Sequence, residues 1–86
     1  MYQVRILDEA ARDLAKLDAA VARRIAGRIR WLAENLEDVQ PETLTGSLAG
    51  FYKLRAGDCR VVYEIVRSEQ MIIIHLADHR REIYRR

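Results

Sequence analysis

Residues 51–77 read FYKLRAGDCRVVYEIVRSEQMIIIHLA, and this stretch decides the fold. It contains three runs rich in β-branched and aromatic residues, which are typical of strands. Short polar segments separate them: Gly57-Asp58, and then Arg67-Ser68-Glu69. Because turns this short join only antiparallel neighbours, the sequence predicts a meander of three strands. We expect these strands at Phe51 to Ala56, Cys59 to Val66 and Gln70 to Ala77.

The N-terminal part of the chain predicts one strand and two helices. Residues 2–7 alternate in the manner of a strand, and Asp8 is a suitable N-cap for the helix that follows. A second helix is expected from about Ala19 to Leu36. Its apolar residues recur at spacings of three and four, which places them on one face. They are Val21, Ile25, Ile29, Leu32 and Leu36.

Residues 38–50 contain the one proline and two of the four glycines, which predicts a connecting loop with a short turn near residues 42–44. The expected order is therefore β-α-α-β-β-β. This order predicts an α+β fold in which a helical hairpin packs on one face of an antiparallel sheet, while the other face stays partly open. With 86 residues, the chain fits one domain spanning 1–86.

Composition excludes several classes of protein. Half of the residues are hydrophobic and a third are charged, which is typical of a globular chain. No apolar run is long enough to cross a bilayer, and the first ten residues do not resemble a secretory signal. The single cysteine is consistent with a reducing compartment, so we expect a cytoplasmic protein without a membrane partner. One cysteine and two histidines make a zinc site improbable, and neither a glycine-rich phosphate loop nor a nucleophile elbow is present.

Charge is distributed unevenly along the chain. Residues 1–50 carry seven basic and eight acidic side chains, whereas residues 51–86 carry eight and five. The last eight residues, HRREIYRR, contain four arginines and one glutamate. A basic C-terminal half favours an anionic partner, either nucleic acid or an acidic protein. A solvated, arginine-rich surface is the alternative interpretation.

A basic and aromatic group of residues could lie together on the open face. Lys53 and Arg55 share one side of their strand, because strand side chains alternate. Arg60 begins the next strand, and the tail adds His79, Arg80, Arg81 and Tyr84. Arginine and lysine stabilise charge on a phosphate in its transition state, and RNA supplies its own 2′-OH nucleophile. This chemistry requires no metal or cofactor.

Each of these residues also has a structural interpretation. Lys53 and Arg55 are compatible with exposed strand positions that discourage edge pairing. Arg60 is able to pair with Glu64 on the same strand face, and Tyr84 is able to anchor the tail. His75 and Trp31 are interpreted as structural, because His75 lies between two apolar residues and Trp31 borders the helix stripe.

Three segments resemble the RelE/ParE toxins of bacterial and archaeal toxin–antitoxin pairs. They are VRILDEAARDLAKL at 4–17, LTGSLAGFYKLRAGDCRVVYEI at 44–65 and HRREIYRR at 79–86. Together they cover nearly the whole chain in the order found in that superfamily. The resemblance implies a RelE-like fold and a toxin that inhibits translation by cleaving mRNA codons in the ribosomal A site. It also implies a cognate antitoxin, with which the toxin forms a hetero-oligomer.

The resemblance also implies roles for individual residues. Lys53 matches the strand lysine, Arg60 the arginine that stabilises the phosphate, and Arg80 the tail arginine that protonates the leaving oxygen, with Arg81 as the register alternative. Tyr84 matches the tyrosine that stacks on or orients the substrate. Further contacts to messenger or ribosomal RNA are expected from Arg55, Arg81, Arg85, Arg23 and Arg28.

One position departs from the family pattern, because Phe51 stands where well-known RelE members have a second lysine. The identity of the general base is therefore open, and His79 is a candidate because imidazole suits proton transfer near neutral pH. The superfamily also contains ParE-type poisons of DNA gyrase. The basic residues and Tyr84 favour a metal-independent endoribonuclease. A gyrase poison and a non-catalytic binding module remain the alternatives.

Overall fold

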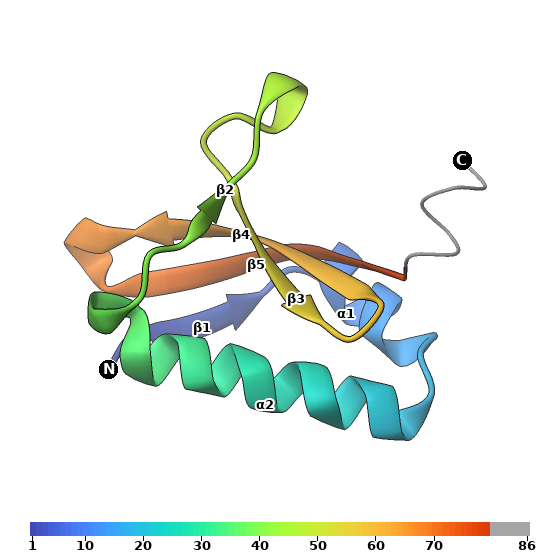
Figure 1. The fold of residues 1–86 in the computed structure, drawn as a ribbon. Coiled ribbons are helices and arrows are strands. Elements are labelled where there is room, and N and C mark those ends of the chain that lie inside the picture. The colour runs from blue at the N-terminus through green and yellow to red at the C-terminus, as the bar shows by residue number, and fades with distance from the viewer. Residues whose placement is uncertain (80–86) are drawn as a thin grey trace.

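The meander is the centre of the sheet. The computed structural model describes residues 1–79, and one sheet in this part of the chain has the strand order β1-β5-β4-β3-β2 (Figure 1). Three of its strands, β3 (Tyr52–Ala56), β4 (Cys59–Val66) and β5 (Met71–His79), pair antiparallel, as predicted. Gly57 adopts a positive φ of 62° in the turn between β3 and β4, a conformation that glycine tolerates without steric cost.

The sheet is mixed rather than fully antiparallel, which corrects one part of the prediction. β1 (Gln3–Ile6) lies beside β5 and runs parallel to it. A parallel neighbour is possible because the long helical connection after β1 allows the chain to return to either end of the sheet. A second correction concerns the loop, where Glu42–Thr43 forms a short strand, β2, that pairs with β3. The expected turn near residues 42–44 is thus part of the sheet.

Two helices, α1 (Asp8–Ala15) and α2 (Ala19–Asn35), follow β1 as expected. The predicted N-cap was wrong by one position: Leu7 is the N-cap, and Asp8 lies within the first turn of α1. An acidic residue there still favours the helix, because it interacts with the positive end of the helix dipole. Short 3-10 turns at Leu36–Asp38, Gly46–Leu48 and Arg67–Glu69 complete the described elements.

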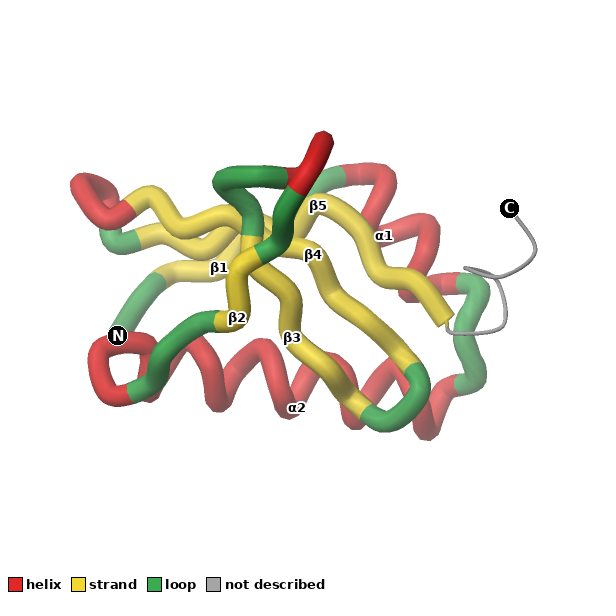
Figure 2. Tube along the Cα trace, turned by 45° about the horizontal axis from the view of Figure 1, so that its top comes forward, coloured by secondary structure: helices red, strands yellow, loops and turns green. Residues whose placement is uncertain are grey.

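The helical hairpin packs on one face of the sheet, which confirms the predicted α+β fold. Figures 1 and 2 show α2 along one face, while the segment between β2 and β3 projects away from it. Ile25, Ile29 and Leu32 of α2 are buried in a single core with strand residues such as Val61 and Ile72. Val21 is only partly buried, because it lies near the start of α2. Within residues 1–79, both α-helices lie on one face of the sheet.

No helix within residues 1–79 combines the length and the apolar character that a membrane span requires.

Candidate functional site

Three cations from two strands share the face opposite the helices. β3 pairs with β4 so that Lys53 lies across from Val62 and Arg55 lies directly across from Arg60. Leu54, between the two cations on β3, turns into the core instead. Because strand side chains alternate, Lys53, Arg55 and Arg60 all project to the outer side. We call these three residues the basic face.

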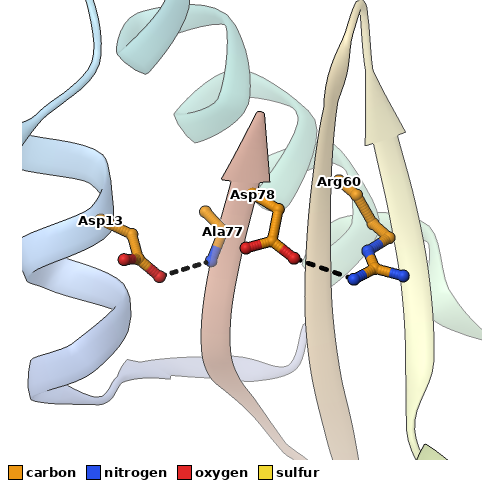
Figure 3. A network of polar contacts seen from close by, with 4 residues as sticks. All are labelled: Asp13, Arg60, Ala77 and Asp78. Carbon is orange, nitrogen blue, oxygen red and sulfur yellow. Dashed lines mark hydrogen bonds and ion pairs between the residues drawn. The ribbon is translucent and has the colours of Figure 1, made fainter. Parts of the chain in front are cut away.

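Arg60 is held by a carboxylate on the neighbouring strand. Its Nη2 donates a hydrogen bond to Oδ2 of Asp78 at 2.8 Å (Figure 3). Only 9% of the Asp78 side chain and 29% of the Arg60 side chain are exposed. The interpretation in which Arg60 pairs with Glu64 is therefore wrong. The register explains this, since Arg60 lies directly opposite Asp78.

This ion pair orients the Arg60 guanidinium. Arg55 lies opposite Arg60 on the other side, and like charges in that position repel. Asp78 offsets this repulsion and limits the conformations of the arginine. A guanidinium carries five N–H donors, and the contact with Asp78 uses one of them. The Nε atom of Arg60 is buried without a hydrogen-bond partner among the described residues. The contact with Asp78 thus orients Arg60 and leaves N–H groups of its terminal nitrogens for the recognition of a phosphate.

Lys53 is held far more loosely. Its Nζ lies 3.6 Å from Oε2 of Glu42 on β2, and 62% of the Glu42 side chain is exposed. An exposed ion pair of this kind contributes at most about 1 kcal/mol. An incoming phosphate would therefore exchange with Glu42 at little cost, whereas the Arg60–Asp78 pair would be retained.

The predicted site residues of the tail divide into two groups. His79 pairs with Cys59, whose side chain is in the core, while the preceding Asp78 pairs with Arg60 on the basic face. By strand alternation His79 projects to the helix-covered side, so the structure does not bring it together with Lys53 and Arg60. The other predicted tail residues lie outside the described residues: Arg80, Arg81, Tyr84 and Arg85.

A second polar pair lies on the same face as Arg60 and was not expected from the sequence. His75 Nε2 lies 2.8 Å from Glu64 Oε1, and its ring contacts Phe51 edge to face at 4.8 Å between centroids. The strands shift register between Val62 and Tyr63, which disturbs the alternation on which the sequence interpretation depended. His75 is thus a hydrogen-bond partner of Glu64 on the outer side of the sheet.

Arg23 and Arg28 are exposed on α2, which covers the side of the sheet opposite the basic face. Arg28 lies over the ring of Trp31, with its guanidinium carbon 5.1 Å from the ring centroid. It also borders a hollow of about 180 Å³ that Lys53 and Arg55 line from the other side. The outer edge of β3 therefore brings Arg28, but not Arg23, near the basic face.

Tyr63 lies at the base of this hollow, where its environment changes its titration. Burial, together with the nearby Tyr52 and Glu42, raises the pKa of the Tyr63 phenol from 10.0 to about 12. The phenol is thus neutral across the physiological range. Within residues 1–79, no three His, Cys, Asp or Glu side chains are arranged as metal ligands.

The fold and the basic face define a class of small toxins that act within toxin–antitoxin pairs. A family model described as the ParE toxin of the type II toxin–antitoxin system, parDE, matches residues 4–84. The chain belongs to this family and thus to the RelE/ParE superfamily.

Individual relatives and solved structures agree with this assignment. Toxin RelG of Mycobacterium tuberculosis is 37% identical, with 99% of this chain and 98% of the relative covered. A putative RelE-like toxin protein of Escherichia coli is 31% identical, with 94% of this chain and 84% of the relative covered. The RelBE2 toxin–antitoxin complex of M. tuberculosis contains a chain with a TM-score of 0.82 and 30% identity, with 92% of this chain and 98% of that chain covered. The isolated E. coli RelE toxin has the same fold, with a TM-score of 0.75 at 20% identity and with 99% and 93% covered.

Proposed function

We propose that this toxin is a ribosome-dependent endoribonuclease that cleaves mRNA codons in the A site through attack by the RNA 2′-OH. The observation that carries this proposal is Arg60, which is held by Asp78 on the outer face of the sheet beside Arg55 and Lys53. A cation fixed before the substrate arrives stabilises developing phosphate charge without reorganisation.

In this mechanism Arg60 contacts the phosphate that becomes pentavalent. Lys53 exchanges Glu42 for a phosphate oxygen and adds electrostatic stabilisation. Arg55 contacts the RNA backbone next to that phosphate. The tail residues Arg80 and Tyr84 retain the roles that the family resemblance implies, namely protonation of the leaving oxygen and stacking on the substrate. His79 is a weaker candidate for the base, because it projects away from Arg60.

The proposed partners follow from the same surface. Structures similar to this chain include toxin–antitoxin complexes such as RelBE2 of M. tuberculosis. We expect a cognate antitoxin to cover the basic face and thereby exclude RNA. Complementary charge would speed this association, and added salt would slow it. The ribosome and its mRNA are the proposed targets, which places the toxin in the cytoplasm.

Inhibition of DNA gyrase is the second candidate function. The observation that favours it is the family model itself, which is described by the ParE toxin. A gyrase poison would not need an arginine fixed for phosphate chemistry, so the Arg60–Asp78 pair favours the nuclease.

The decisive experiment measures single-turnover cleavage of mRNA bound to ribosomes. We expect cleavage by the parent toxin to continue in the presence of a chelator. Arg60→Ala should slow the chemical step roughly 10²- to 10³-fold, as the loss of an oxyanion-hole donor does. Binding should weaken less, because other phosphate contacts remain. Arg12→Ala, which removes an exposed arginine on α1, is the matched control. Full activity of Arg60→Ala would contradict the mechanism, and inhibited gyrase supercoiling without mRNA cleavage would establish the alternative.

A further inference from the structure

The hollow beside β3 lies next to the short strand β2. β2 pairs with β3 only at Tyr52 and Lys53 within the described chain. The segment Val39, Gln40 and Pro41 before β2 and the second half of α2 contribute to the hollow beside β3. The hollow has a volume of about 180 Å³. Its wall includes Arg28 and Trp31 from α2 as well as Lys53 and Arg55 from β3.

The size of the hollow limits what it accepts. Pockets for drug-sized molecules typically enclose roughly 300–1,000 Å³. This hollow is smaller and open to solvent along the edge of β3, so it fits one flat group that remains attached to a larger molecule outside. Its lining is partly apolar, because the buried residues Leu32 and Leu54 belong to it.

An aromatic platform forms one side. Trp31 is the only tryptophan of the chain, and 43% of it is exposed. A tryptophan at a helix surface exposes a large apolar area to water. A second flat ring that covers the indole would remove this area from water. The guanidinium carbon of Arg28 lies over the same indole, 5.1 Å from its ring centroid. Aromatic rings and guanidinium planes are the two groups on which proteins stack unpaired bases.

The charged residues that line the hollow favour a ligand that also carries negative charge. Arg28, Lys53 and Arg55 supply three positive charges around the opening, against one carboxylate from Glu42. Glu42 is largely exposed and loosely paired with Lys53, so it moves away from an arriving phosphate at little cost. A flat apolar surface bordered by cations fits a base with its adjoining phosphates.

We propose that the hollow binds one unpaired nucleobase of single-stranded RNA, stacked on Trp31 and Arg28, while Lys53 and Arg55 contact the phosphates on either side. The proposal rests on the proposed function for its choice of RNA, but it concerns binding and does not require cleavage. Since Arg55 lies directly opposite Arg60, this base would be a near neighbour of the phosphate that Arg60 contacts.

The single tryptophan provides a direct test. We would titrate the full-length toxin with a short 2′-O-methyl oligoribonucleotide, which lacks the attacking hydroxyl and cannot be consumed. We expect a saturable change in the emission of Trp31. An abasic oligonucleotide of the same length and charge should bind more weakly and leave the emission nearly unchanged.

Substitutions distinguish the contribution of stacking to RNA binding from that of charge. Trp31→Leu keeps an apolar side chain but removes the ring, and should weaken oligonucleotide binding roughly 5- to 150-fold, the range for one stacked base. Trp31→Phe should retain most of the affinity. Arg28→Gln should weaken binding more than Arg12→Gln, which removes another exposed arginine, on α1.

Several results would overturn the proposal. These are unchanged affinity in Trp31→Leu, equal emission changes from the abasic and the intact oligonucleotide, or no binding of RNA. A response to an acidic peptide but not to RNA would show that the hollow takes a protein segment instead. If the parent binds the oligonucleotide as expected yet fails to cut mRNA on ribosomes, the proposed function fails while this binding site stands.

Discussion

Asp13 Oδ2 accepts a hydrogen bond from the backbone N–H of Ala77 at 3.1 Å, although 64 positions separate the two residues in the chain (Figure 3). β1 ends its pairing with β5 at Ile74, so the last part of β5 extends beyond its parallel neighbour. Asp13 of α1 supplies the acceptor that a longer β1 would have provided. This contact holds the end of β5, on which Asp78 lies.

Asp13→Ala should therefore lower the free energy of unfolding by about 1–3 kcal/mol, because the partly buried N–H of Ala77 loses its partner. Arg12→Ala, at the exposed neighbouring position, should change it by less than about 0.5 kcal/mol. Urea unfolding of both variants measures the difference. Equal free energies of unfolding for the two variants would show that water replaces the Asp13 carboxylate without loss of stability.

Ile29→Ala should destabilise the protein by about 2–5 kcal/mol, since Ile29 is buried between α2 and the sheet. Glu34→Ala on the exposed side of the same helix serves as the control. Chemical denaturation monitored by circular dichroism gives both values. A change under about 0.5 kcal/mol for Ile29→Ala would contradict the packing of α2.

Asp78→Ala should slow mRNA cleavage through its effect on Arg60, because an unpaired guanidinium samples more orientations. Binding of mRNA should change less than the cleavage rate. In a double-mutant cycle, adding Asp78→Ala to Arg60→Ala should cause little further loss of rate, since the pair then acts as a unit. Additive losses would mean that Asp78 acts independently of Arg60.

The raised pKa of Tyr63 predicts that the protein loses stability at alkaline pH. Its pKa is about 12 in the folded protein against 10.0 without the fold, so between these values the unfolded chain releases a proton that the folded chain retains. The free energy of unfolding should fall as pH rises through this window, by about 3 kcal/mol in total, and this contribution is fully present below pH 10. Tyr63→Phe should show a shallower decline. Parallel curves for parent and variant between pH 9 and 12 would exclude this cause.

Much of the fold was predictable, because it depends on local patterns. The short turns around Gly57 and Ser68 required an antiparallel meander, and the three-and-four spacing of Ile25 and Ile29 identified the buried side of α2. The parallel pairing of β1 with β5 was not predictable in this way, since no local signal states which strand a distant segment joins. The two-residue strand β2 was too short to produce any alternation.

The candidate site was predictable only where strand alternation is regular. Lys53, Arg55 and Arg60 project to one side as expected, because β3 and β4 pair without interruption there. The side to which His79 projects depends on its register opposite Cys59, which the sequence alone does not give. The sequence interpretation of Trp31 was packing at the border of the helix stripe, and it gave no sign that the residue is 43% exposed beside a hollow.

The position of β5 also determines when the site comes into existence. β5 lies between β1 and β4, so the last strand of the described residues joins the first to the rest of the sheet. Protein synthesis proceeds from the N-terminus, and pairing across so long a loop is entropically slow. Arg60 is therefore synthesised 18 residues before the Asp78 that orients it. While the ribosome is still synthesising β5, Arg60 has no Asp78 to orient it. Arg60 is therefore oriented only after β5 has paired with β4.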